Sequence, residues 1–290
     1  MKQSNCPIIA TISYRVMFDM APTSLNKAWR HIMKVTQIRN ATQIVEYAGK
    51  KFLIDPMFSE KDAYDGFVGT VRSEIRNPMV ELPMDISSLL DVDAIIVTHT
   101  HPDHWDQAAA NIVPKDKLIY VQNENDEALL KTQGFINLIV LTETSSFDDI
   151  ELIKTTCQHG SDEAYANPQL AEMLGDASGV VFRHSSEKTL YLVGDSIWTK
   201  TVEDNMRKYM PDVLIMNTGW AHVLDYGAII FGKEDILKVH FVLPDAQIVA
   251  THMEALNHCL VTRHELLEYA QINHIQDYVS APADGESVTL

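Results

Sequence analysis

Residues 94–106 read AIIVTHTHPDHWD, an apolar run that leads directly into three histidines and two aspartates. A short apolar run that ends in polar residues is typical of a buried strand. His99 and His101 alternate, so at the end of such a strand their side chains project on the same side. Pro102 then turns the chain before a helix that begins within HWDQAAAN. We therefore predict a strand-to-helix turn at a sheet edge, where α/β proteins bind ligands.

The residue types in this turn indicate a metal site. Three imidazoles and one carboxylate, those of His99, His101, Asp103 and His104, suit a borderline divalent cation. A lone histidine here would most simply be structural. An ordered set of four such side chains is hard to attribute to chance.

Three further candidate ligands end apolar runs elsewhere in the chain. His159 closes IELIKTTCQH, Asp195 closes TLYLVGD and His252 closes QIVATH. Singly, each is more simply a cap or a turn former. Their recurrence predicts that all three reach a common sheet edge.

The rest of the pattern predicts a layered α/β fold. Strand-like runs alternate with helical ones, and GK at 49–50 is typical of a hairpin turn. The segment NDEALLKTQ before Gly134 and the segment TRHELLEYAQ at 262–271 are expected helices, the second opened by a Thr262–Glu265 capping box. We expect one domain over 33–290. Residues 1–32 are expected to be an N-terminal extension or a misassigned start.

The composition argues against several classes of partner. The 290 residues contain 23 Lys and Arg against 40 Asp and Glu, a formal net charge of −17, which opposes binding to nucleic acid or to an anionic membrane. No apolar run approaches the ~18 residues of a membrane helix. The three cysteines predict no disulfide framework. We expect a cytoplasmic protein, and the sequence predicts no oligomeric state.

The run THTHPDHWD resembles the His-x-His-x-Asp-His signature of the metallo-β-lactamase fold, and the later His, Asp and His follow in that superfamily's order. IVEYAGKKFLIDPMF, VGDS and PADGES resemble framework segments of the metal-dependent hydrolases related to ascorbate-6-phosphate lactonase. This resemblance implies a four-layer αββα sandwich over 33–290.

The resemblance also implies a dinuclear centre. His99, His101 and His159 would hold one ion, Asp103, His104 and His252 the other, and Asp195 would bridge them. Zn or Mn is expected, and Fe is possible with the same ligand types. Two cations lower the pKa of a shared water, so a bridging hydroxide is the expected nucleophile, with Asp103 as the catalytic carboxylate that orients it.

Three neighbouring residues are weighed as substrate or supporting groups. His258 is the rival of His252, which we prefer because it ends the apolar run. Trp220 and His222 are expected either to line the pocket or to be a buried tryptophan beside a solvated histidine.

The predicted function is hydrolysis of an ester, lactone or phosphoester in a small, anionic metabolite. A di-iron redox enzyme on the same fold and a non-catalytic metal-binding protein are the alternatives. The loops at 57–90 and 160–178 are expected to select the substrate.

Overall fold

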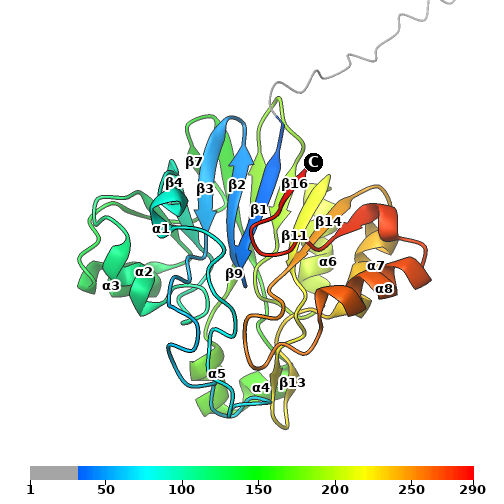
Figure 1. The fold of residues 1–290 in the computed structure, drawn as a ribbon. Helices are drawn as coiled ribbons and strands as arrows, with labels where there is room; N and C mark the ends of the chain where they lie inside the picture. Colours follow the sequence, from blue (N-terminus) through cyan, green and yellow to red (C-terminus); the bar gives the residue numbers. More distant parts are fainter. Residues whose placement is uncertain (1–31) are drawn as a thin grey trace, which may run out of the picture.

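The computed structural model describes residues 32–290 and contains two seven-stranded mixed sheets that pack face to face (Figure 1). The first sheet has the order β16-β1-β2-β3-β4-β5-β6, and the second has the order β15-β14-β11-β10-β9-β8-β7. A short two-stranded ribbon, β12-β13, lies apart from both sheets.

The strands of the first sheet are β1 Lys34–Arg39, β2 Thr42–Tyr47, β3 Lys50–Ile54, β4 Ala94–Val97, β5 Ile119–Val121, β6 Leu138–Val140 and β16 Ser287–Thr289. Those of the second are β7 Ser145–Phe147, β8 Ile150–Thr156, β9 Ser178–Arg183, β10 Leu190–Leu192, β11 Val213–Asn217, β14 Gln247–Thr251 and β15 Val279–Ser280. The ribbon strands are β12 His222–Val223 and β13 Gly227–Ala228.

Helices cover the outer face of each sheet, so the layers are helix, sheet, sheet, helix (Figure 1). The first sheet is covered by α1 Ile86–Leu89, α2 Gln107–Ile112 and α3 Glu124–Thr132. The second is covered by α6 Lys200–Tyr209, α7 Lys233–Val242 and α8 Arg263–Ile272, with a 3-10 turn η1 at Gln276–Tyr278. The short helices α4 Asp162–Ala166 and α5 Pro168–Leu174 lie beyond the lower end of the sheets in Figure 1.

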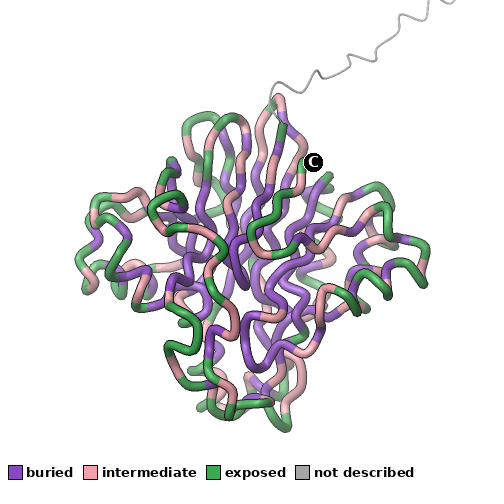
Figure 2. Tube along the Cα trace, viewed as in Figure 1, coloured by how far each residue is buried: buried purple, intermediate pink, exposed green. Residues whose placement is uncertain are grey.

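The alternation of side chains along the strands builds this layering. On β9, Val180 and Phe182 join the core between the two sheets, whereas Val181 joins the core under α6–α8. On β4, Ile96 points to the inter-sheet core and Ile95 to the core under α2 and α3. Figure 2 shows the strands buried and the outward helix surfaces exposed. The predicted αββα sandwich is confirmed.

Several local predictions are also confirmed. Thr262 and Glu265 form the predicted capping box of α8, and β2 and β3 form the predicted hairpin. Its turn lies at Ala48 and Gly49, both with positive φ, one residue before the predicted pair 49–50, because Lys50 already pairs with Tyr47 in the ladder. The sequence missed the helices α4 and α5, which occupy part of the expected loop at 160–178. Each is too short to show a clear helical period.

The fold brings one end of both sheets to a shared edge. Strands β3, β4 and β5 run parallel, as do β10, β11 and β14, so their carboxyl ends gather on the same side of the molecule. None of the helices within 32–290 has the length and apolar character needed to cross a membrane. The expectation for the N-terminal segment concerns residues 1–32. Residues 1–31 lie outside the described part of the chain, and Ile32 is exposed.

Candidate metal centre

The turn after β4 is fixed by its own backbone. The N–H groups of His104 and Trp105 both donate to the carbonyl of His101, at 2.9 and 2.8 Å. Asp106 then caps α2 by accepting from the N–H of Ala109. Trp105 is buried against Phe135 in the core under the first sheet. The turn therefore presents its polar side chains from a rigid base.

The first cluster consists of His99, His101 and His159. His99 Nε2 lies 3.0 Å from His101 Nδ1. One ligand atom from each of the three histidines falls within 4.8 Å of the others. His159 reaches them from the loop after β8, across the gap between the two sheets.

The second cluster consists of Asp103, His104 and His252. His252 Nε2 lies 3.2 Å from Asp103 Oδ2 and 3.2 Å from His104 Nε2. His252 follows β14 and has φ 60°, a left-handed conformation that turns the chain at the sheet edge.

Asp195, which follows β10, lies between the two clusters. Its Oδ2 is 3.1 Å from His104 Nε2, 3.6 Å from His159 Nε2 and 3.9 Å from His99 Nε2. Its other oxygen, Oδ1, accepts a hydrogen bond from Asn217 Nδ2 at 2.6 Å. Asp195 is therefore held where one oxygen faces both clusters, as a bridging ligand requires.

The histidines are oriented by hydrogen bonds on their outward nitrogens. His101 Nε2 donates to the Met173 carbonyl at 2.9 Å, so Nδ1 keeps its lone pair. His159 Nδ1 donates to the Ile229 carbonyl at 2.9 Å, so Nε2 keeps its lone pair. Partners of this kind fix the tautomer that metal binding requires.

Asp55 performs the same role for His104, and the sequence reading missed it. His104 Nδ1 donates to Asp55 Oδ2 at 2.8 Å. The carboxylate of Asp55 also accepts from the backbone N–H and the hydroxyl of Thr98, both at 2.7 Å. The available signal was that Asp55 ends the run KFLID as Asp195 ends TLYLVGD.

The charges of the centre fit a cation. Asp55, Asp103 and Asp195 are buried carboxylates, and within 32–290 their ion-pair partners are all histidines rather than Lys or Arg. Burial alone would lower the pKa of His104, but Asp195 and the other carboxylates outweigh it and raise this pKa to about 10. Buried charges in proteins are paired with an opposite charge or bound to a metal ion. The residues present therefore fit divalent ions.

Of the two rival histidines, His252 lies in the second cluster and His258 does not. His258 instead lines the adjoining cavity, and burial lowers the pKa of its imidazole to about 4. Ala221 and Val223 line the same cavity, whereas His222 between them packs edge-on against Trp220 at 4.2 Å between ring centroids. Neither Trp220 nor His222 is among the residues that line this cavity.

The cavity beside the centre has a volume of about 260 Å³. His101, Asp103, His159 and Asp195 form its polar side. Its apolar walls are formed by Phe67, Val68, Met173, Leu174, Ala221, Val223 and Ile229. The loops at 57–90 and 160–178, which are expected to select the substrate, both contribute to its walls.

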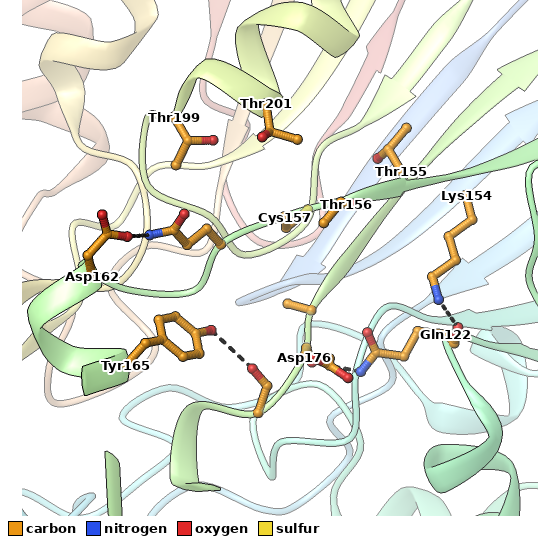
Figure 3. A pocket seen from close by; sticks show the side chains of 13 residues that line it. Gln122, Lys154, Thr155, Thr156, Cys157, Asp162, Tyr165, Asp176, Thr199 and Thr201 are labelled. Carbon is orange, nitrogen blue, oxygen red and sulfur yellow. Dashed lines mark hydrogen bonds between the residues drawn. The ribbon is translucent and has the colours of Figure 1, made fainter. Parts of the chain in front are cut away.

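A second cavity, of about 440 Å³, is drawn in Figure 3. It is polar, with Lys154 donating to the Gln122 carbonyl and Tyr165 donating to the Gly175 carbonyl at 3.0 Å. Cys157 lies on its wall and donates to the Val193 carbonyl. No ligand candidate of the centre lines this cavity among the described residues, whereas four of them line the smaller one.

Known proteins resemble this chain over most of its length. A family model described as Beta-lactamase superfamily domain matches residues 50–253. The UPF0173 protein YddR of Bacillus subtilis is 45% identical over 259 residues, which cover 89% of this chain and 100% of that protein.

Two solved structures are similar in both sequence and shape. An isothiocyanate hydrolase from Delia radicum gut bacteria is 53% identical, with a TM-score of 0.87 over 89% of this chain and 99% of that one. A possible metal-dependent hydrolase from Veillonella parvula is 44% identical, with a TM-score of 0.88 over 90% and 100% of the two chains.

Proposed function

The chain belongs to the metallo-β-lactamase superfamily, in its UPF0173 family of metal-dependent hydrolases, and from this premise we propose that it hydrolyses small uncharged electrophiles, isothiocyanates (R–N=C=S) foremost. The proposal includes two divalent ions. His99, His101 and His159 would hold one, Asp103, His104 and His252 would hold the other, and Asp195 would bridge them.

The apolar cavity next to the ligand clusters carries the choice of substrate. Its described lining contains no Lys or Arg that would pair with an anionic group. Val68, which is 88% exposed, and Met173, which is 45% exposed, extend this apolar surface toward solvent. An uncharged molecule with an apolar substituent matches such walls. The 53% identity to an isothiocyanate hydrolase supports the same substrate class.

The proposed reaction balances without a further reactant. The water oxygen bonds to the central carbon of R–N=C=S as the carbon–nitrogen π bond breaks. One proton of the water goes to nitrogen. The other passes from oxygen to sulfur as a C=O π bond replaces the C=S π bond, which gives R–NH–C(=O)–SH. The carbon–nitrogen bond then breaks as the S–H proton moves to nitrogen, and the products are R–NH₂ and O=C=S.

The chain's own residues position the reactants. Bound divalent ions would lower the pKa of a shared water and polarise the substrate. Asp103 lies on the cavity wall, with its Oδ2 3.2 Å from His252 Nε2, where its carboxylate can orient the water and take its proton.

The expectation of an anionic ester, lactone or phosphoester, which the resemblance to the ascorbate-6-phosphate lactonase group suggested, stays a prediction. It belongs in the same test because the metal chemistry would be shared. The di-iron redox alternative also stays open to test, since imidazole and carboxylate ligands suit iron as well as zinc and manganese.

The test uses the full chain reconstituted separately with Zn, Mn and Fe. Benzyl isothiocyanate is supplied, and benzylamine and O=C=S are measured, beside a panel of lactones, esters and phosphodiesters. Elemental analysis and an optical spectrum report the bound metal. We expect amine release that depends on metal. Hydrolysis of the lactones, esters or phosphodiesters without release of benzylamine would refute the isothiocyanate proposal. Release of benzylamine that persists after metal removal would also refute it.

A further inference from the structure

His258 is a buried histidine that the centre does not use. Its side chain is 5% exposed, and its Nδ1 is shielded from solvent without a hydrogen-bond partner. Because this Nδ1 is sealed, the ring can reach a molecule in the cavity only through Nε2, and a proton on Nε2 leaves Nδ1 as the unpaired lone pair. Because burial lowers the pKa of His258 to about 4, the ring is neutral at neutral pH and offers one N–H and one lone pair.

The ring of His258 lines the same cavity as Asp103 and Asp195. Phe67 packs against it edge-on, with ring centroids 5.1 Å apart. The backbone is also fixed, because the N–H of His222 donates to the His258 carbonyl at 3.2 Å. The imidazole is therefore held in the wall of the cavity that Asp103 and Asp195 also line.

The neighbouring Asn257 fixes this arrangement from behind. Its Nδ2 donates to Thr70 Oγ1 at 2.9 Å and to the Val71 carbonyl at 2.8 Å. Its Oδ1 accepts from Asn77 Nδ2 at 2.7 Å and from the Phe67 N–H at 3.3 Å. One buried amide thus ties the Phe67 loop to the His258 segment, which is the support that a preorganised donor needs.

We propose that His258 is a substrate-contacting residue whose imidazole N–H donates a hydrogen bond to the nitrogen of R–N=C=S. This inference rests on the proposed function. Attack at the central carbon places negative charge on nitrogen before the water's proton arrives there. A donor already held in place beside apolar walls stabilises this charge as it develops. His258 moves no proton in this role, so the stoichiometry of the reaction is unchanged.

A second histidine supplies the matched control. His240 on α7 also has a buried Nδ1 without a partner, but its ring packs against Tyr278 at 4.9 Å and is absent from the cavity lining. If an unpaired nitrogen were only a packing defect, replacing either histidine would have the same effect on the reaction.

The experiment compares His258→Phe, His258→Gln and His240→Phe in the zinc-loaded protein, with metal content and thermal unfolding measured for each. Glutamine keeps an N–H donor, and phenylalanine does not. We expect His258→Phe to lower kcat/KM for benzyl isothiocyanate about tenfold to a hundredfold. His258→Gln should retain most of the activity, and His240→Phe should match the wild type.

A binding measurement gives a readout apart from turnover. Benzylthiourea carries an N–C=S group and serves as a non-reactive probe. In protein with isotope-labelled histidine nitrogens, the ring signal that is missing in His258→Gln should shift on titration with benzylthiourea, and the His240 signal should not.

The outcomes separate this inference from the proposed function. If the wild type is active and His258→Phe equals it, His258 makes no functional contact and only this inference falls. If the wild type does not hydrolyse isothiocyanates, the proposed function falls and the titration decides the inference. An unmoved His258 signal at saturating probe would then overturn it.

Discussion

Asp55→Asn is the sharpest test of how the centre is built. Asp55 Oδ1 accepts from the Thr98 N–H, and Oδ2 accepts from the Thr98 hydroxyl and from His104 Nδ1. Asparagine keeps one acceptor oxygen and turns the other into a donor. The backbone N–H of Thr98 cannot accept, so the asparagine oxygen must stay on that side.

The new amide N–H₂ of the variant therefore faces His104. To avoid two opposed donors, His104 must accept at Nδ1 and carry its proton on Nε2. Nε2 is the nitrogen that lies 3.1 Å from Asp195 Oδ2 and would bind the metal. Loss of such an outer partner typically lowers metal affinity about 10- to 100-fold, which corresponds to about 1.4 to 2.7 kcal/mol.

The assay is competition of the metal-free protein with a chromophoric chelator during zinc titration. Wild type should show two tight sites, and Asp55→Asn should weaken the site of Asp103, His104 and His252 while the other remains. Asp126→Asn is the matched control, because Asp126 is also a buried carboxylate but bonds the hydroxyl of Thr100, which is no ligand candidate. If Asp55→Asn still bound two zinc ions tightly, as Asp126→Asn is expected to do, the proposed change of the His104 tautomer would be refuted.

Three further predictions follow from the same geometry. At saturating zinc, Asp103→Asn should lower turnover about two to four orders of magnitude, as loss of a general base does; near-normal kcat would exclude that role. His252→Ala should lose one ion by elemental analysis and His258→Ala should keep both, and the reverse result would exchange their roles. Gly219→Ala would place a Cβ against the carbonyl oxygen of His252, so we expect denaturant unfolding to show a loss of stability of about 1–3 kcal/mol and metal titration to show weaker binding of one ion. Unchanged stability and metal binding would show that the backbone at His252 can shift to accommodate the methyl group.

The sequence predicts which candidate ligands come together because their positions follow from strand geometry. A polar residue that ends an apolar run, such as Asp195 or His252, is carried to the sheet edge by the strand before it. The prediction needs only the parallel order of β10, β11 and β14, which the alternating pattern also implies. Long-range contacts then require no separate signal.

The supports of the centre leave a weaker trace in the sequence. The acceptors for His101 and His159 are the carbonyls of Met173 and Ile229, and a carbonyl is present at every residue whatever its side chain. The helix that places Met173 is too short for periodicity to reveal. The direction of the Trp220 side chain could not be predicted for a related reason. Trp220 lies next to the short β12-β13 ribbon, which is held by a bridge between Val223 and the distant Thr70.

The same distinction predicts that substitutions can change substrate choice while the centre stays constant. The candidate ligands are fixed by strand ends and by the turn after β4, whereas the cavity walls at Phe67 and Val68 belong to a segment without regular secondary structure. That segment is anchored by a few buried polar contacts. The guanidinium of Arg39 donates to the carbonyls of Met57, Ser59 and Val80. The side chain of Asn257 donates to the hydroxyl of Thr70. Substitutions between these anchors can reshape the walls without moving a ligand. Their effects should therefore appear in kcat/KM ratios between substrates rather than in metal affinity.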